Sequence, residues 1–191
     1  MIHTLALFGG AGVLPFVSSL TYIVSILRGR ARPQRMTRLL LVVITGLSFT
    51  ALLVGQDRSG GFWLALTALI QAVVIWLLAL KYGMGGRERL DWVCFGLCGL
   101  GVLLWLLFTQ SLIGLLLSIA ADCVAIVPSL RKTIKLPHTE SLTFFAVDTV
   151  AGLLVLVAGP YTWRTALYPL YIAAINGVYV FVLLRPRILK V

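Results

Sequence analysis

Long apolar runs separated by short polar gaps dominate the chain. The runs cover about residues 4–27, 38–55, 62–81, 92–108, 111–128, 142–159 and 168–184. A helix that crosses a bilayer needs about 20 mostly apolar residues. We therefore predict an all-α integral membrane protein with seven transmembrane helices. The fourth and fifth runs are separated only by Thr109-Gln110, and reading them as one long helix would leave six spans, the main alternative.

The composition favours lipid as the main surrounding of the chain. Hydrophobic residues make up 60% of it and charged residues 12%, and the mean hydropathy is +1.04. A soluble domain typically has about 45–50% apolar and about 25% charged residues. The net charge of +10 could suggest a nucleic-acid partner, but the basic residues lie in the short gaps between apolar runs. Such residues hold helix ends at the membrane surface, so we expect a lipid bilayer and no nucleic acid as partner.

The distribution of lysine and arginine predicts the orientation. The first, third and fifth gaps and the carboxyl-terminal tail hold 14 of the 16 basic residues, and the other two are Arg58 and Arg164. The third gap includes Arg87, and the tail includes Lys190. Basic residues are enriched on the cytoplasmic side of membrane proteins. The amino terminus is therefore predicted outside and the carboxyl terminus in the cytoplasm, and the short loops suit a multi-pass protein of a bacterial inner membrane.

No arrangement of side chains in the sequence predicts an enzyme, a metal site or a cofactor. Cys94 and Cys98 share a helix face, but neither a histidine nor a further cysteine completes a ligand set beside them. The glycine-rich Gly83-Met-Gly-Gly86 lacks the Lys-Ser/Thr that follows a phosphate-binding loop. We therefore expect no catalytic residues, no metal and no cofactor.

A weak internal repeat divides the chain. A shift of 104 positions superposes the helix boundaries of residues 18–81 on those of 122–185, and six of the 38 positions from 18 to 55 are identical. The matches include Pro33 with Pro137, Thr45 with Thr149, and Gly55 with Gly159. The repeat predicts two parallel three-helix bundles, residues 1–83 and 111–191, joined by a linker helix in residues 84–110. Membrane transporters are often built from such repeats, with the substrate between them.

The predicted linker helix carries three glycines. Gly96, Gly99 and Gly101 are small residues that allow neighbouring helices to approach closely. We expect this helix to pack through them.

One hairpin resembles the PQ-loop pattern. Pro128 is followed, after a basic segment, by Glu140-Ser141-Leu142-Thr143. In the PQ-loop family a Pro-Gln pair precedes a basic turn and a Thr-Glu-Gly-Leu-Ser-like sequence. The SWEET-like (MtN3) transporters of this superfamily share the 3+1+3 helix plan with the amino terminus outside. The resemblance therefore implies a transporter of a sugar, an amino acid or a vitamin-like solute.

The hairpin departs from the family pattern at several positions. Ser129 replaces the glutamine, Ser141 replaces the glycine, and Val24 stands where the first repeat would have its proline. The literal Pro33-Gln34 lies in a turn and is not equivalent to the motif. A sorting receptor of the same plan is also known, so the resemblance supports the superfamily more than any one cargo.

Two prolines within the apolar runs are candidate hinges. A proline inside a helix removes a backbone hydrogen bond and can kink the helix. Pro15 and Pro128 are placed to do this, and the resemblance implies that Pro128 permits rocking between open states. The alternative is that Pro128 ends its helix at the membrane edge.

Asp122 and Asp148 are the acids inside the apolar runs. Ionisable groups at such depths are costly and mark functional sites by default. Both are candidates for proton coupling, and Asp148 is also placed to bind substrate. The alternatives are a structural pair with Arg131 or Lys132, or a protonated side chain bonded to a neighbouring helix.

Polar side chains near the centres of other runs are candidate substrate contacts. Gln71 and Asn176 fall one position apart in the repeat alignment, and the resemblance matches Asn176 to one of two asparagines that contact sugar in SWEET transporters. Thr45 and Thr149 form an equivalent pair. The alternative for the amides is hydrogen bonding between helices, and a threonine can satisfy its hydroxyl on the preceding turn of its own helix.

The leading hypothesis is a small-metabolite transporter that works by alternating access between two bundles, with the substrate between the second, third, sixth and seventh helices. The second is a non-transporting receptor or assembly subunit of the same fold. It predicts a closed core and a partner-binding surface in the basic turns. A weaker third hypothesis is a lipid-handling protein, with a lateral opening between helices as its sign. A homo-oligomer is compatible with each.

Overall fold

The computed structural model describes residues 9–56, 60–85, 88–107, 111–158 and 162–188, and every regular element in these ranges is a helix. The elements are η1 (Gly9–Val13), α2 (Leu14–Leu27), α3 (Arg35–Val54), α4 (Gly60–Tyr82), α5 (Arg89–Leu107), α6 (Ser111–Ala125), α7 (Val127–Lys135), η2 (Pro137–Thr139), α8 (Leu142–Ala158) and α9 (Trp163–Ile188). The predicted turn at Thr109-Gln110 lies outside the described residues, as do Arg58, Arg87 and Lys190.

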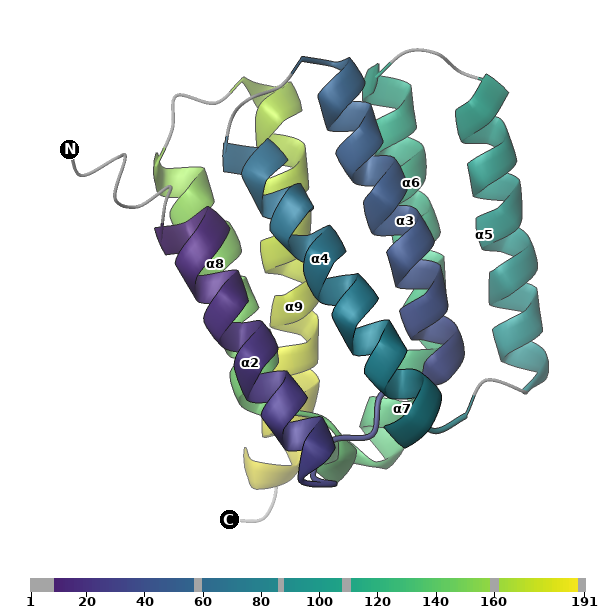
Figure 1. Cartoon of the computed structure of the whole chain (residues 1–191), viewed down its shortest axis with the longest axis vertical. Coiled ribbons are helices and arrows are strands. Elements are labelled where there is room, and N and C mark those ends of the chain that lie inside the picture. The colour runs from purple at the N-terminus through teal and green to yellow at the C-terminus, as the bar shows by residue number, and fades with distance from the viewer. Residues whose placement is uncertain (1–8, 57–59, 86–87, 108–110, 159–161, 189–191) are drawn as a thin grey trace.

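The helices coincide with the predicted apolar runs. Because η1 continues into α2, and α6 is followed by α7 after one residue, the described chain contains seven helical segments, as predicted (Figure 1). Five of them are long and apolar enough to cross a membrane, at 10–27, 35–54, 61–82, 112–135 and 163–185. The helix α8 is apolar but has 17 residues. This fold is compatible with a multi-pass integral membrane protein.

The exposed surface of the helices is rich in large apolar side chains. Phe16, Ile70, Leu103 and Phe181 are each more than half exposed. Soluble monomers rarely expose such surface over a wide area. The side chains are therefore suited to contact with lipid.

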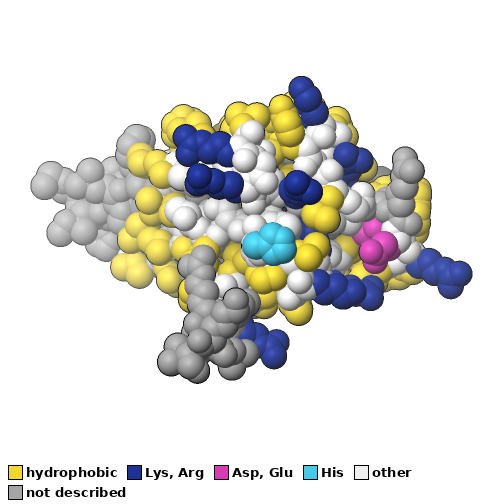
Figure 2. All heavy atoms as spheres, turned by 90° about the horizontal axis from the view of Figure 1, so that it is seen from below, with side chains coloured by type: hydrophobic (Ala, Val, Ile, Leu, Met, Phe, Trp, Pro, Cys, Tyr) yellow, Lys and Arg dark blue, Asp and Glu magenta, His cyan; other side chains and the backbone are white. Residues whose placement is uncertain are grey.

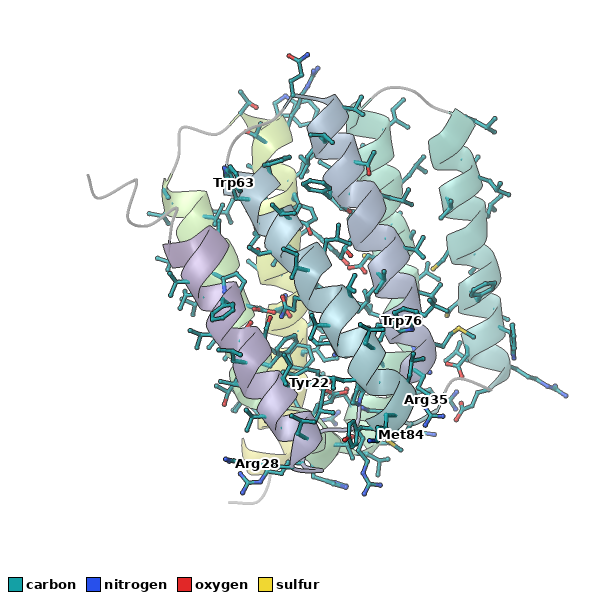
Figure 3. The ribbon with its side chains drawn as sticks, viewed as in Figure 1. Tyr22, Arg28, Arg35, Trp63, Trp76 and Met84 are labelled. Carbon is teal, nitrogen blue, oxygen red and sulfur yellow. The ribbon has the colours of Figure 1, made fainter. Side chains whose placement is uncertain are left out.

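Lysine and arginine gather at one end of the molecule, which we call the basic end. It is the end at which α2, α4, α7 and α9 finish and α3, α5 and α8 begin (Figure 1). Figure 2 views the molecule from this end and shows the basic side chains spread over it. In Figure 3, Arg28, Arg35 and Met84 lie at the basic end, and Trp63 lies near the opposite one.

Two loops are tied together at the basic end by Gln34 and Asp91. The Gln34 side chain caps α3 by accepting the Thr37 N–H at 2.6 Å, and it donates to the Asp91 carboxyl at 2.5 Å. The same carboxyl accepts the Glu88 N–H at 2.8 Å, just before α5 begins. The starts of α3 and α5 are therefore fixed to one another by side chains that also satisfy their backbone donors.

The helix that contains Pro128 does not end there. Pro128 is the second residue of α7, and the chain remains helical to Lys135. A proline is tolerated in the first turn of a helix because its missing N–H has no partner to lose there. Pro128 therefore stands at the break between α6, which ends at Ala125, and α7, and this position is compatible with a hinge and with a helix end. The basic segment after it, which we expected to be a turn, is helical.

For the description of contacts we call α2, α3 and α4 the first group and α6 to α9 the second. In the first group α4 lies between α2 and α3. In the second, α9 packs against α8 on one side and contacts α6 and α7 on the other. The groups meet where α2 packs on α8 and α3 packs on α6, and α5 packs outside against α6 and α3 (Figure 1).

Glycine provides close helix contact at a different place from the one predicted. Gly96 and Gly99 are exposed, and a Cβ on either would meet nothing within 4 Å. Gly101 does face a neighbour, with the Ala121 methyl 3.2 Å from the position of its Cβ. Between α8 and α9 the backbones approach closely at Gly152, where a Cβ would lie 2.9 Å from the backbone nitrogen of Ala173. Of the three predicted glycines, only Gly101 therefore supports packing of α5.

Candidate functional site

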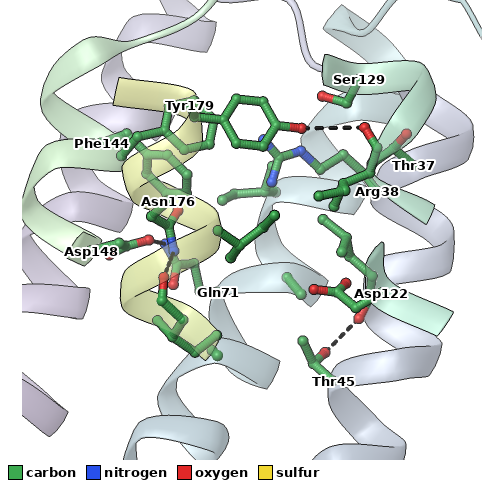
Figure 4. A pocket seen from close by; sticks show the side chains of 18 residues that line it. Thr37, Arg38, Thr45, Gln71, Asp122, Ser129, Phe144, Asp148, Asn176 and Tyr179 are labelled. Atoms are coloured by element: carbon green, nitrogen blue, oxygen red, sulfur yellow. Dashed lines mark hydrogen bonds between the residues drawn. The ribbon is translucent and has the colours of Figure 1, made fainter. Parts of the chain in front are cut away.

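A cavity of about 100 Å³ lies between the two groups of helices. Side chains of α3, α4, α6, α7, α8 and α9 line it (Figure 4). Four of the five residues predicted to bind substrate line it, namely Asn176, Gln71, Asp148 and Thr45, and so does Asp122. A smaller cavity of about 40 Å³ adjoins it and shares Gln71, Asp148 and Asn176. The fold thus gathers polar residues that the sequence places on separate helices.

Asp148 on α8 joins three helices. Its carboxyl accepts the Ser18 hydroxyl of α2, and it accepts the Gln71 amide of α4 at 3.1 Å. The Gln71 amide also lies 3.4 Å from the Ser18 hydroxyl. All three side chains are buried. A buried carboxyl needs such donors because its charge or its lone pairs would otherwise be unsatisfied.

Asp122 on α6 has one satisfied oxygen and one without a partner. Its Oδ2 accepts the Tyr171 hydroxyl of α9. Its Oδ1 is buried and has no hydrogen-bond partner in the part of the chain that the structure describes. Tyr171 therefore takes part in the site as a hydrogen-bond donor.

The ion pairs proposed as alternatives for the two aspartates are not formed. Lys132 pairs with Glu140, and Arg131 lies 3.8 Å from Glu88 with both side chains largely exposed. Asp122 and Asp148 are bonded to neighbouring helices instead. Of the structural interpretations, the one with hydrogen bonds to neighbouring helices matches the geometry.

The threonine pair is not brought together in the cavity. Thr45 lines it and donates its hydroxyl to the Leu41 carbonyl at 2.6 Å. Thr149 is not among the lining residues, and its hydroxyl donates to the Phe145 carbonyl at 2.8 Å. Both hydroxyls are therefore satisfied on their own helices. The prediction that Thr149 contacts substrate has no geometric support.

Asn176 on α9 keeps part of its amide free for other partners. Its nitrogen donates to the Ile172 carbonyl of the same helix at 2.9 Å. Asn176 is half-buried and lines the cavity beside Asp148 and Gln71 (Figure 4). An amide oxygen can accept two hydrogen bonds, so this side chain has capacity left toward the cavity.

A chain of charged and polar groups begins at Arg38, which lines the cavity. The Arg38 guanidinium of α3 donates to the Tyr22 hydroxyl of α2 at 3.0 Å, and this hydroxyl donates to Glu140 at 2.5 Å. Glu140 in turn accepts from Lys132 of α7. Tyr22 is fully buried, and Figure 3 places it on α2 near the basic end. The chain of bonds, which we call the Arg38–Lys132 network, links both groups of helices.

The sequence reasoning missed Arg38 and Tyr22 as site residues. Arg38 was counted among the basic residues that hold helix ends at the membrane, although it stands at the edge of an apolar run. Tyr22 shares a helix face with Pro15, Ser18 and Ile26, and these four are the buried residues of α2. That periodicity is visible in the sequence and could have assigned Tyr22 to the interior. No pattern in the sequence shows that Arg38 turns inward.

Pro15, the other predicted hinge, stands at the second position of α2 directly after the π-helical η1. Its carbonyl accepts the Ser19 hydroxyl at 2.8 Å and lies 3.0 Å from the Ser18 hydroxyl, which donates to Asp148. A π-helical turn often occurs at functional sites. Pro15 also lines the small adjoining cavity.

Comparison of the chain with protein-family models, with curated proteins and with solved structures gave no significant match. The chemistry of the site therefore rests on its geometry. The cavity offers two carboxyl groups, two amides and a guanidinium to a solute between helices. Among the described residues, no cluster of three or more His, Cys, Asp or Glu side chains could hold a metal ion.

Proposed function

We propose that the chain is a transporter of a small polar solute that works by alternating access between two three-helix bundles. The bundles are α2–α4 and α6–α9 with the segments that flank them, within residues 1–83 and 111–191, and α5 is the linker. The observation that supports this best is the cavity between helices of both bundles, which has Asp148, Gln71 and Asn176 among its lining side chains. Transporters of repeated architecture hold their substrate in this position.

The repeat supports the assignment of the bundles. The helix α3 ends at Val54 and α8 ends at Ala158, which are 104 positions apart, the same shift that aligns the two halves of the sequence. The packing of α2 on α8 has its repeat counterpart in the packing of α6 on α3. Two interfaces related in this way allow one bundle to rock against the other. The PQ-loop and SWEET-like resemblance is part of this proposal.

The cavity is small in the conformation described here. Pockets for drug-sized ligands measure about 300–1,000 Å³, whereas this cavity has about 100 Å³. The Arg38–Lys132 network runs from Arg38, which lines the cavity, to Lys132 of α7 near the basic end. We take that end as cytoplasmic, with the amino terminus outside, in a bacterial inner membrane, because basic residues favour the cytoplasmic side.

One observation favours the second candidate, a non-transporting receptor or assembly subunit. Gln71 is bonded to Ser18 and Asp148 on neighbouring helices, which a closed structural core would require. The lipid-handling alternative has an apolar pocket of about 180 Å³ between α2 and α4, which also reaches Gln71. Neither alternative accounts for the free capacity of Asp122 and Asn176 in the central cavity.

Uptake into vesicles reconstituted with the full chain tests the transporter. The panel holds radiolabelled sugars, amino acids, vitamins and short carboxylates, with protein-free vesicles as background. Asn176→Leu should abolish uptake by filling the cavity with an apolar side chain. Thr50→Val is the matched control, because the Thr50 hydroxyl bonds the Gly46 carbonyl of its own helix at 2.8 Å.

The proposal is supported if the unaltered chain and Thr50→Val both take up a solute of the panel and Asn176→Leu does not. It fails if no member moves and none raises the thermal unfolding midpoint of the purified protein. Proton coupling through Asp122 or Asp148 is tested with an imposed pH gradient. Uptake that such a gradient leaves unchanged would exclude it.

A further inference from the structure

Two side chains of opposite charge in the central cavity each have an unsatisfied polar atom. Arg38 is 6% exposed and Asp122 is 8% exposed. The Arg38 Nε and the Asp122 Oδ1 have no hydrogen-bond partner in the described part of the chain, although Arg38 Nη2 reaches Tyr22 and Asp122 Oδ2 accepts from Tyr171. More than about 90% of buried polar groups are satisfied in folded proteins, so both atoms require an explanation.

Both side chains enter the cavity from neighbouring helices. Arg38 belongs to α3 and Asp122 to α6, which pack against one another. In Figure 4 they come from the side opposite Asp148, Gln71 and Asn176, and the Arg38 guanidinium reaches across the cavity, 5.8 Å from the Phe144 ring. A ligand in the cavity would meet a guanidinium and a carboxyl group together. The ligand that satisfies both carries an anionic and a cationic group of its own.

The size of the cavity restricts the ligand further. A cavity of about 150 Å³ accepts benzene, and this one has about 100 Å³. A hexose, with about twice as many heavy atoms as benzene, is much larger than this space. Glycine, with five heavy atoms, and alanine, with six as in benzene, come nearer to the available size.

We infer that the cavity binds a small zwitterionic aminocarboxylate, with its carboxylate toward Arg38 and its ammonium group toward Asp122. Small side-chain shifts bring the buried Nε and Oδ1 into contact with these groups. The adjoining polar wall of Gln71 and Asn176 can receive the remaining hydrogen bonds of the ligand. This inference rests on the proposed function, because it names the substrate class of the proposed transporter.

Equilibrium binding to the purified full chain tests the inference without transport. The probe is radiolabelled alanine, competed by glycine, by propionate, which lacks the ammonium group, and by ethylamine, which lacks the carboxylate. We expect glycine to compete, and propionate and ethylamine to be weaker by about tenfold or more, since each forfeits one charge-assisted hydrogen bond. Absence of alanine binding, or equal competition by propionate or ethylamine, overturns the inference.

Substitutions of Asp122 and Arg38 test which residue contacts the ammonium group of the ligand and which contacts its carboxylate. Asp122→Asn should weaken alanine binding about tenfold or more and leave propionate competition unchanged, because only the ammonium contact is lost. Arg38→Lys should weaken alanine and propionate alike. If Arg38→Lys does not fold, Asp122→Asn still decides the question. Asp91→Asn is the matched control, because Asp91 is a buried acid that lines a separate cavity at the basic end.

The outcomes separate this inference from the proposed function. Alanine binding without vesicle uptake would support the site and contradict the transporter. Uptake of another solute by vesicles, with no alanine binding, would support the transporter and overturn the zwitterion site. A uniform fall in affinity across Asp122→Asn and Asp91→Asn would also overturn it, because the effect would then be general to buried acids.

Discussion

Ser18 and Asp148 form a hydrogen bond between α2 and α8, and so join the two groups of helices next to the central cavity. The repeat aligns Ser18 with Asp122 and Asp148 with Ile44, which lie at the corresponding α6–α3 contact. The polar pair at one interface is thus replaced by an acid and an apolar side chain at the other. Ile44 of α3 offers no hydrogen bond, so Asp122 is bonded to Tyr171 of α9 instead and its Oδ1 has no partner among the described residues.

Ser18→Ala should lower the free energy of unfolding by about 1 kcal/mol, because hydrogen bonds between membrane helices contribute about 0.6 to 1.7 kcal/mol and Asp148 keeps the Gln71 amide. Reversible unfolding in mixed detergent measures the change. Ser19→Ala is the control, since the Ser19 hydroxyl donates to the Pro15 carbonyl of its own helix at 2.8 Å. Equal effects of the two substitutions would show that the bond to Asp148 contributes nothing.

Tyr22→Phe removes a hydroxyl that lies between Arg38 and Glu140 in the Arg38–Lys132 network. Two buried charged groups then lose a partner, and we expect a loss of about 1–3 kcal/mol in stability. Thermal unfolding of the purified protein measures it. Tyr168→Phe is a matched control, because the Tyr168 hydroxyl is buried and has no partner among the described residues.

Tyr168→Phe should therefore be neutral or stabilising, since it removes a desolvated hydroxyl that makes no bond. Both substitutions remove one tyrosine oxygen, but only Tyr22→Phe also removes hydrogen bonds. The difference in stability between them therefore measures the contribution of the hydrogen bonds. A Tyr22→Phe protein as stable as Tyr168→Phe would exclude an energetic role for the network.

Most of the fold could be predicted from the sequence because lipid-facing helices have a strong compositional signal. Apolar runs of near-membrane length end where polar gaps begin, and these ends agree with the helices to within a few residues at most boundaries. The exception is α7. Its exposed Arg131 and Lys135 resemble a loop by hydropathy, whereas its buried Pro128, Ser129 and Thr133 are small or polar. Hydropathy alone cannot detect such a helix.

The candidate site could be predicted only in part. Asp122, Asp148, Gln71 and Asn176 stand out because polar groups are rare within apolar runs. Their partners do not stand out, since a serine such as Ser18 is common in membrane helices and often bonds its own backbone. The partner of each polar group depends on how the helices pack. The only information on this packing in the sequence is the weak repeat.

Gly152→Ala should separate α8 from α9. The added Cβ would lie 2.9 Å from the Ala173 nitrogen and 3.0 Å from the Pro169 carbonyl oxygen, and neither backbone atom can move alone. Overpacking of this kind costs about 1–3 kcal/mol. Gly96→Ala is the control, because nothing lies within 4 Å of its Cβ position. Thermal midpoints measured side by side check the pair, and a Gly152→Ala protein as stable as Gly96→Ala would contradict the close packing.

Pro128→Ala tests whether the break between α6 and α7 serves movement. Alanine supplies the N–H that proline lacks, so the carbonyl of Val124 can be satisfied and the helix can become continuous. We expect stability to rise by about 1 kcal/mol, the usual net value of one hydrogen bond. If rocking of the bundles bends the chain here, the initial rate of uptake should fall severalfold while binding of the solute persists.

Pro137→Ala is the comparison for this substitution, because Pro137 begins the short η2 after α7 and lies outside the helix break. Uptake should be close to that of the unaltered chain when Pro137 is replaced. A Pro128→Ala protein that is more stable and transports at full rate would assign Pro128 a local structural role. The hinge is therefore identified by opposite changes in stability and rate, which a general loss of folding cannot produce.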